Sequence, residues 1–302
     1  MSDSAAVIST AHLTKTFGAT RALDGLDLDV PAGEVHGFLG PNGAGKTTTL
    51  RILMGLLRPT SGQVRVLGLD PWADQVAVHR RVAYVPGDVV LWPTLSGGEV
   101  IDLLGRLRGT VDRARRDALV DRFDLDPSKR CRDYSKGNRQ KVALVAAFAA
   151  RAELMILDEP TAGLDPLMER VFADLVGEVR AEGRTVLLSS HILSEAEELC
   201  DRVSIIGSGR LVDSAPLREL RGAHHTLVDA RFRTPVAPSA FAGLTGVGDL
   251  RVEATSVTCR VEPEGLAPLL SVLAGLGAVS LTCTPPSLED VFLAHYESEA
   301  VR

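Results

Sequence analysis

The chain has 302 residues, with 33 lysines and arginines against 39 aspartates and glutamates, which gives a formal net charge of −6. Its content of 45% hydrophobic and 24% charged residues is typical of a folded globular protein and excludes an intrinsically disordered one. The negative charge argues against a general nucleic-acid-binding protein, and the length favours two domains, since single cores seldom grow beyond about 150–200 residues.

The four cysteines lie far apart and form neither a CxxC pair nor a cluster with histidine. Their spacing predicts neither a zinc site nor a disulfide framework, and it favours a reducing compartment such as the cytosol. Residues 265–288 carry no charge, but glycine, proline, serine and threonine interrupt them throughout. A membrane-spanning helix needs about 20 predominantly apolar residues, so we expect no membrane span here.

Short apolar runs alternate with polar residues over residues 5–30, a pattern that predicts antiparallel strands joined by turns. The sequence then predicts a buried strand at Gly33–Gly40, a glycine-rich turn, and an apolar helix at Thr47–Leu57. Another strand is expected at Arg81–Pro86, and helices are expected over most of residues 95–152. This order is typical of the first half of an α/β domain.

Two continuous apolar runs, Leu154–Glu159 and Thr185–His191, each end in polar residues. Such runs fit parallel strands that are covered on both faces. We therefore expect an α/β domain over residues 1–221, with a helical insertion at about residues 89–152. Helices are predicted to follow the two strands, at Leu167–Ala181 and Leu193–Cys200.

Residues 222–302 predict a second, smaller α+β domain. Its β-α-β-β-α-β order is that of a split βαβ domain. The expected elements are strands at Thr226–Phe232, Leu250–Ala254, Val257–Val261 and Val279–Cys283, and helices at Pro238–Leu244, Leu266–Ala274 and Leu288–His295.

A phosphate-binding sequence lies between the predicted strand and helix of the first domain. Gly40–Thr47 matches the pattern GxxxxGK[ST], in which glycines let backbone N–H groups surround an anion at a helix N-terminus. Lys46 would contact the β- and γ-phosphates, and the Thr47 hydroxyl would bind Mg²⁺. A glycine-rich turn without a ligand is the alternative. The candidate nucleotide-binding residues of this loop are Gly40, Pro41, Asn42, Gly43, Ala44, Gly45, Lys46, Thr47 and Thr48.

Two carboxylates follow the apolar run that begins at Leu154. Asp158, at the end of that strand, would lie beside the bound nucleotide and hold Mg²⁺. Glu159, the next residue, would polarise the attacking water as a general base. The alternative is that two solvent-exposed acids merely end a strand. The presence of the phosphate loop in the same domain argues against this alternative.

With these motifs, residues 1–221 resemble the ATP-binding cassette of ABC transporters, a P-loop NTPase fold with a RecA-like core, an antiparallel β subdomain and a helical subdomain. Glu159–Pro166 is similar to the catalytic-glutamate and D-loop segment of that family. The resemblance implies an ATPase in which Asp165 contributes to the nucleotide site, His191 contacts the γ-phosphate, and Phe17 stacks on adenine. Taken alone, a histidine such as His191 more often simply ends a strand, but its order after Asp158 and Glu159 favours the γ-phosphate contact; Phe17 could instead belong to the core.

The family signature LSGGQ corresponds here to Tyr134–Gln140, where Ser135 and Gly137 match and Lys136 and Asn138 differ. In this family the signature acts on ATP bound by the second subunit. The resemblance therefore implies that Ser135 and Gly137 complete the nucleotide site of a homodimer.

A sequence closer to the consensus, Leu95–Glu99, lies too early in the chain, where the helical insertion begins. We expect it to be an ordinary helix N-terminus, with Ser96 as its cap. It is therefore not a candidate for the nucleotide site.

The Q-loop is a second departure from the family. After Tyr84–Pro86 the family usually has Gln or Glu, whereas this chain has Gly87 followed by Asp88. Glycine has no side chain with which to bind Mg²⁺ or orient water, so Asp88 is the candidate substitute. The phosphate loop, the two carboxylates and His191 remain in place.

The segment Pro286–Phe292 resembles the ending of cassettes from multidrug and antibiotic exporters of the daunorubicin-resistance type, which pair with a separate permease. An amphipathic closing helix is the alternative explanation.

The resemblance implies an ATP-hydrolysing subunit that binds ATP and Mg²⁺, pairs with a second copy, and powers a separate permease at the cytoplasmic face of the membrane. The cargo would be a drug, an antibiotic or another hydrophobic compound, and no nucleic-acid partner is expected. The alternative is a soluble ABC ATPase that acts on ribosomes or DNA, although this chain has one phosphate loop and no sustained heptads. A third possibility is a binding module with little turnover, which Gly87 and the altered signature suggest.

Overall fold

The computed structural model describes residues 6–109, 112–222 and 225–284. The chain divides into two compact units, Met1–Ser214 and Ala215–Arg302, which are described separately below. The described residues contain no helix that is both long enough and apolar enough to cross a membrane.

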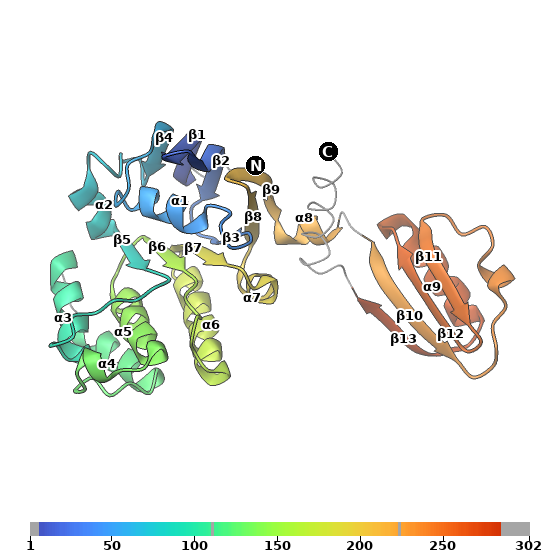
Figure 1. Ribbon diagram of the computed structural model, residues 1–302. Helices are drawn as coiled ribbons and strands as arrows, with labels where there is room; N and C mark the ends of the chain where they lie inside the picture. The colour runs from blue at the N-terminus through green and yellow to red at the C-terminus, as the bar shows by residue number, and fades with distance from the viewer. Residues whose placement is uncertain (1–5, 110–111, 223–224, 285–302) are drawn as a thin grey trace. The chain divides into compact units, whose positions relative to one another are not determined.

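The first unit begins with an antiparallel sheet of three strands, in the order β2-β1-β4 (Figure 1). Strands β1 (Ala6–Phe17) and β2 (Thr20–Pro31) pair along their length and are joined by a tight turn, which confirms the prediction for residues 5–30. Strand β4 (Ser61–Val66) adds to the other side of β1. Alternate residues of β1 and β2 are buried, so one face of this sheet forms part of the core.

A six-stranded sheet forms the centre of the first unit, in the order β5-β6-β7-β3-β8-β9. Its neighbouring strands from β5 to β8 are parallel, and every residue of β3, β6 and β7 is buried, as continuous apolar runs predict. The strands are β3 (Val35–Leu39), β5 (Val82–Val85), β6 (Leu154–Asp158), β7 (Thr185–Ser190), β8 (Arg202–Gly207) and β9 (Arg210–Pro216).

Helix α1 (Lys46–Leu53) lies between the two sheets, and its apolar residues belong to the same core cluster as residues of both (Figure 1). It ends four residues before the predicted Leu57. The reason is a close approach at Gly55, whose φ is 63° and where a Cβ would lie 2.0 Å from the carbonyl oxygen of Pro71. A glycine is therefore needed there, and the chain turns away from the helix.

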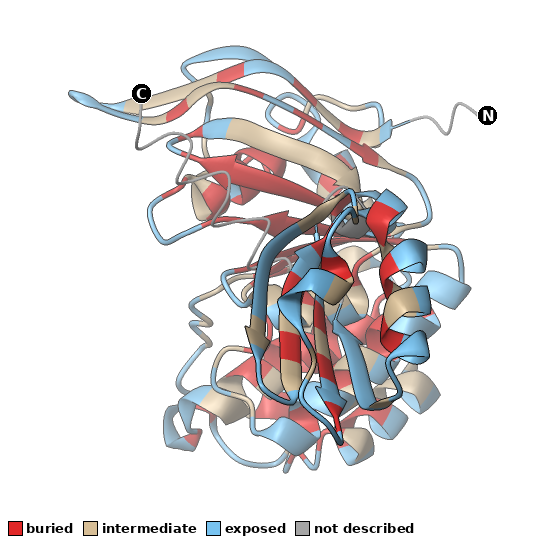
Figure 2. Ribbon diagram, turned by 90° about the vertical axis from the view of Figure 1, so that its right-hand side faces the viewer, coloured by how far each residue is buried: buried red, intermediate tan, exposed pale blue. Residues whose placement is uncertain are grey.

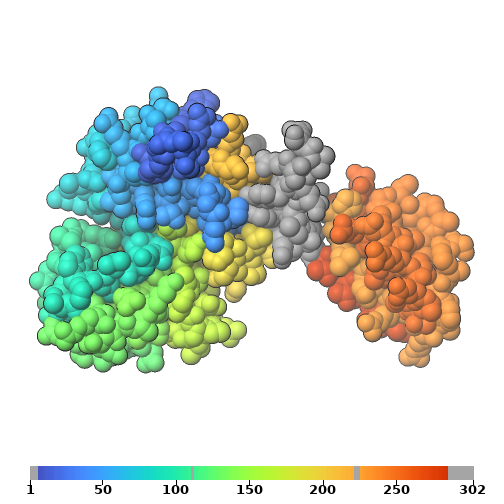
Figure 3. Space-filling view, viewed as in Figure 1, coloured from blue at the N-terminus to red at the C-terminus, as the bar shows by residue number. Residues whose placement is uncertain are grey.

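Further helices cover the central sheet or form the helical insertion. Figure 3 shows the insertion as the teal and green part of the first unit. The prediction that residues 95–152 are mostly helical is confirmed. The helices are α2 (Gln75–Arg81), α3 (Gly97–Arg108), α4 (Arg113–Arg122), the 3₁₀ turn η1 (Cys131–Asp133), α5 (Lys136–Ala149), α6 (Pro166–Ala181) and α7 (Leu193–Leu199).

The second unit contains a four-stranded antiparallel sheet in the order β11-β12-β10-β13. Helix α9 and the short turn η2 pack on one face of this sheet and close an apolar core. The β-α-β-β-α-β order is as expected, except that the first helix is only a 3₁₀ turn. The elements are α8 (Leu217–Gly222), β10 (Thr226–Phe232), η2 (Pro238–Phe241), β11 (Val247–Glu253), β12 (Ser256–Val261), α9 (Pro263–Gly275) and β13 (Ala278–Thr284).

The α/β fold class expected from the sequence is confirmed by this architecture. The closing helix expected at Leu288–His295, and with it the exporter-like segment Pro286–Phe292, lies outside the described residues.

Candidate nucleotide site

The phosphate loop connects the buried strand β3 to helix α1. Gly43 and Gly45 adopt left-handed conformations, with φ of 85° and 111°. A Cβ at Gly40 would lie 2.3 Å from the carbonyl oxygen of Ile206, so this position also requires glycine. The loop leads directly into the N-terminus of α1, where the first backbone N–H groups have no partner within the helix and are available to an anion.

Lys46, the first residue of α1, is only 5% exposed and folds back over the loop. Its ammonium donates hydrogen bonds to the carbonyl oxygens of Gly40, at 2.6 Å, and Pro41, at 3.2 Å. Burial lowers the pKa of Lys46, while the negative charges of Glu159 and Asp158 oppose this shift. The lysine therefore lies in the field of both predicted carboxylates.

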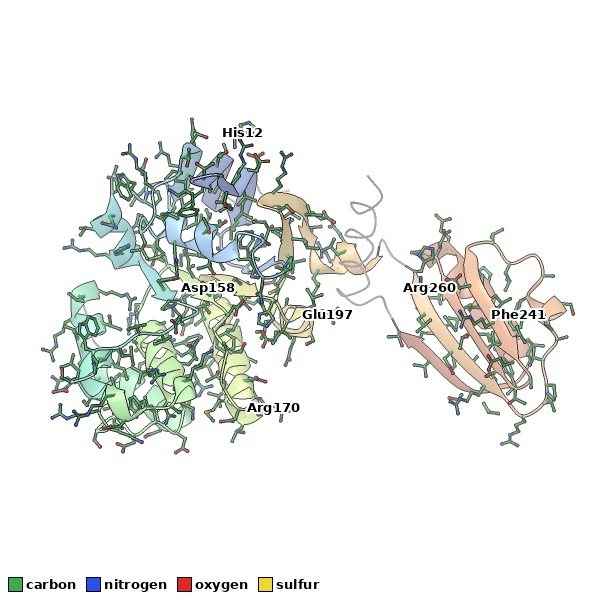
Figure 4. All side chains as sticks on the ribbon, viewed as in Figure 1. His12, Asp158, Arg170, Glu197, Phe241 and Arg260 are labelled. Carbon is green, nitrogen blue, oxygen red and sulfur yellow. The ribbon has the colours of Figure 1, made fainter. Side chains whose placement is uncertain are left out.

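Asp158 is the last residue of β6 and is 2% exposed (Figure 4). Its Oδ1 accepts a hydrogen bond of 2.6 Å from the hydroxyl of Ser189, the residue opposite it on β7. Burial and the neighbouring charge of Asp158 raise the pKa of Tyr84 to about 12. Ser189 was not predicted as a site residue. Its position at the polar end of the apolar strand β7 is the sequence signal that could have identified it.

The Q-loop segment after β5 does pass beside this carboxylate. A Cβ at Gly87 would lie 3.4 Å from the carbonyl oxygen and 3.5 Å from the carboxylate of Asp158, which is ordinary contact distance. Packing therefore leaves room for a Cβ atom at this position. The glycine removes a possible contact with the site without being required by the backbone.

Glu159 has a left-handed backbone conformation, with φ of 46°, which is uncommon for a residue other than glycine. Its N–H donates a hydrogen bond of 3.1 Å to the carbonyl oxygen of Ser189. Its Oε1 lies 3.1 Å from Nδ1 of His191, and both side chains are partly exposed. Strained conformations of this kind concentrate at functional sites, and here the turn brings Glu159 and His191 together.

Glu195, on α7, connects the segments that carry these two residues. Its two carboxylate oxygens accept hydrogen bonds of 2.8 Å each, one from the hydroxyl of Thr161 and one from that of Ser190. Thr161 follows Glu159 by two residues, and Ser190 immediately precedes His191. Glu195 belongs to none of the sequence motifs, and only the fold brings it to Thr161.

The signature and D-loop segments contact each other within the same chain. A Cβ at Gly137 would lie 2.4 Å from the carbonyl oxygen of Gly163, and the Gln140 amide donates a 2.8 Å hydrogen bond to the carbonyl oxygen of Pro160. Ser135 caps α5 by accepting a hydrogen bond from the N–H of Asn138. Among the described residues, no hydrogen bond joins this pair of segments to the phosphate loop.

Asp165 caps helix α6, where its Oδ1 accepts hydrogen bonds from the N–H groups of Leu167 and Met168. Phe17 ends β1 and is 48% exposed, which excludes a core position, and the Lys15 ammonium lies 4.9 Å from its ring centroid. The roles of Asp165 and Phe17 toward a nucleotide stay predictions.

The early LSGGE sequence is the N-terminus of α3, as expected. The Ser96 hydroxyl accepts a hydrogen bond from the N–H of Glu99, and the Glu99 carboxylate accepts one from the N–H of Ser96. This reciprocal capping box explains the sequence without a role in nucleotide binding.

Comparison with known proteins gives one consistent family. A sequence profile described as ABC transporter matches residues 23–162, which include the phosphate loop, the signature segment and both carboxylates. The chain is 38% identical to the daunorubicin resistance ATP-binding protein DrrA3 of Streptomyces coeruleorubidus, over 97% of this chain and 96% of that protein. It is 30% identical to the bacitracin transport ATP-binding protein BcrA of Bacillus licheniformis, over 95% of this chain and 96% of that protein.

Solved structures agree with the sequence matches. An ATP-binding subunit of an ABC transporter gives a TM-score of 0.68 at 32% identity, over 71% of this chain and 92% of that one. A dimeric ATP-binding cassette, in a post-hydrolysis state with ADP and Pi, gives a TM-score of 0.64 at 25% identity, over 70% of this chain and 99% of that one.

Proposed function

Since the chain belongs to the ATP-binding subunits of ABC transporters, whose cassettes bind ATP and hydrolyse it, we propose that it powers a separate membrane permease for export of a drug, an antibiotic or another hydrophobic compound. The cargo class rests on the relatives, whose names concern daunorubicin resistance and bacitracin transport. The chain would then act at the cytoplasmic face of the membrane, held there by the permease. We propose residues 1–221 as the ATP-binding domain and residues 222–302 as the C-terminal domain.

The phosphate loop would bind the triphosphate, with Lys46 leaving its carbonyl partners to contact the β- and γ-phosphates. Thr47 and Asp158 would hold Mg²⁺, which neutralises phosphate charge when bound. The donor set fits this ion, because hydroxyl and carboxylate oxygens are the ligands that Mg²⁺ prefers. Ser189 occupies one oxygen of Asp158 and fixes the direction of the other.

The contact of 3.1 Å between Glu159 and His191, immediately after Asp158, is the observation that supports hydrolysis most directly. Glu159 would accept a proton from the attacking water, and His191 would orient the carboxylate and contact the γ-phosphate. Both are partly exposed, so water can reach the carboxylate. The left-handed turn at Glu159 keeps this side chain apart from buried Asp158.

A second copy would complete the site. Ser135, Gly137 and Asp165 would face the ATP that is held by the phosphate loop of the other copy. The close contact between Gly137 and Gly163 means that the signature and D-loop of one chain would meet that ATP together. Phe17, exposed at the end of β1, would stack on adenine.

Steady-state hydrolysis of ATP by purified wild-type protein and by Glu159→Gln, with and without the permease, tests these roles. Loss of the general base should lower the rate by about 100-fold or more, while ATP binding persists and an ATP-dependent dimer accumulates. Glu169→Gln, an exposed change on α6, is the matched control and should hydrolyse ATP normally. Undiminished hydrolysis by Glu159→Gln would contradict the choice of base, and no turnover by the wild type would favour a binding module.

A further inference from the structure

The sheet of the second unit has one covered and one uncovered face. On β10, Val228, Ala230 and Phe232 are at most 5% exposed, because they point toward α9 and η2. The residues between them point to the opposite face, and Figure 2 shows the resulting alternation of buried and exposed positions. Figure 4 labels Phe241, which is buried on η2 at the covered side, and Arg260, which is an exposed residue of β12.

Four charged residues on the uncovered face form a regular pattern across β10, β12 and β11. In one row Asp229 lies opposite Thr258, which lies opposite Arg251. In the next row Arg231 lies opposite Ser256, which in turn lies opposite Glu253. Each row therefore has a negative charge at one end, a positive charge at the other end and a small hydroxyl residue in the middle. The order of the two charges is reversed from one row to the next.

These residues share one surface. Together with Thr255 they line an open hollow of about 410 Å³. Asp229 is partly exposed, and Arg231, Arg251 and Glu253 are exposed. Within the part of the chain that the structure describes, no ion pair joins any two of these four charges, so each is available to an external partner.

The four charges stand at the ends of the two rows and alternate in sign around them, so the pattern is complementary to a second copy of itself. If two copies meet face to face across a two-fold axis parallel to β12, Asp229 faces Arg251 of the second copy and Arg231 faces Glu253 of the second copy. If the axis instead runs across the strands, Asp229 faces Arg231 and Arg251 faces Glu253. Both arrangements place each of these four charges opposite one of the other sign, as an isologous interface requires, and Arg260, on the same face, pairs with Asp249 of its own chain at 3.7 Å.

We propose that this uncovered face of the C-terminal sheet is a self-association surface that docks on the same face of a second copy of the chain. The hydroxyl residues in the middle of each row are small enough to let the two faces approach closely. Exposed ion pairs contribute little individually, so the association would be weak between free chains. It would become effective when the cassettes dimerise, because the second face is then held at high local concentration.

Charge reversal in the full-length chain tests the proposal through the dimer dissociation constant, measured by sedimentation at low salt. Asp229→Arg should weaken the dimer by about tenfold or more, because like charges then face each other. Arg233→Glu, an exposed reversal in the loop after β10, should have no such effect. An equal effect of both reversals, or none for Asp229→Arg, would overturn the proposal.

Two double reversals distinguish the orientation of the axis. Adding Arg251→Asp to Asp229→Arg restores the dimer if the axis is parallel to β12, whereas adding Arg231→Asp restores it if the axis runs across the strands. Rescue by one pair and not the other supports the interface. Rescue by neither would overturn it.

Cross-linking provides a measurement that does not depend on net charge. The double variant Ser256→Cys, Thr258→Cys, made with Cys283→Ser to remove the exposed native thiol, should form a dimer with a short bis-maleimide. The same background with Ser239→Cys, on η2 at the covered side, should not. No cross-link with or without ATP, or loss of the cross-link when the permease is present, would overturn the proposal, and neither result bears on ATP hydrolysis.

Discussion

Replacing Glu195 with alanine should disconnect the segment that carries Glu159 from the segment that carries His191. The carboxylate accepts hydrogen bonds of 2.8 Å from both Thr161 and Ser190, and Thr161 is only 9% exposed. A hydrogen bond to a charged group contributes about 1.5–3 kcal/mol, and the partial exposure of this site favours the lower end. Loss of both bonds should therefore cost about 2–4 kcal/mol in the free energy of unfolding.

The same variant should lower kcat for ATP hydrolysis by about tenfold or more, because small displacements of a general base are costly. KM for ATP should change little, since Glu195 does not contact the phosphate loop. Denaturant unfolding and steady-state kinetics measure the two effects. Glu195→Gln should recover most of both, because an amide can accept from one hydroxyl and donate to the other.

Glu198→Ala is the matched control, an exposed change on the same helix that should leave stability and kcat unaltered. If Glu195→Ala unfolds and turns over like this control, the carboxylate does not connect the two segments. A change confined to KM would also refute the reasoning.

Two further predictions concern other parts of the first unit. Ser96→Ala should lower the free energy of unfolding by about 1 kcal/mol, because the helix cap is lost, and should leave kcat unchanged. Ser135→Ala should lower kcat. Equal kinetics of the two variants would contradict the assignment of Tyr134–Gln140 as the signature. Hydrogen bonds from Arg210 and Arg21 hold the pKa of Asp24 below its usual value of 3.8. The wild type should therefore have a higher free energy of unfolding than Asp24→Asn near neutral pH, and this difference should be lost as the pH falls below 3.8. Denaturant unfolding measures the difference. A difference that persists in acid would exclude these bonds as its cause.

The parts of the fold that could be predicted are those in which sequence pattern and burial coincide. Strands β3, β6 and β7 are apolar runs buried along their whole length, and the glycine-rich turn after β3 has a fixed spacing. Strand β4 was missed because it is polar at its start, and β9 because its residues are only partly buried. The end of α1 depends on the distant carbonyl of Pro71, which no local pattern records.

The candidate site shows the same division. Lys46, Asp158 and Glu159 belong to local motifs, and their order along the chain was enough to propose them. Ser189 and Glu195 act across strands and loops that are about 30 residues apart in sequence, so their contacts depend on the register of β6 with β7 and on the position of α7. The polar end of β7 marks Ser189 in the sequence, but only the folded chain shows which residues Ser189 and Glu195 contact.

Transport in inverted membrane vesicles tests the central claim most directly. Vesicles that contain the chain together with its membrane permease should accumulate a hydrophobic drug when ATP is added. Vesicles with Glu159→Gln, or with the permease alone, should not. Equal accumulation in all three, or recovery of the wild-type chain with ribosomes rather than with the membrane, would contradict an ATPase that powers export.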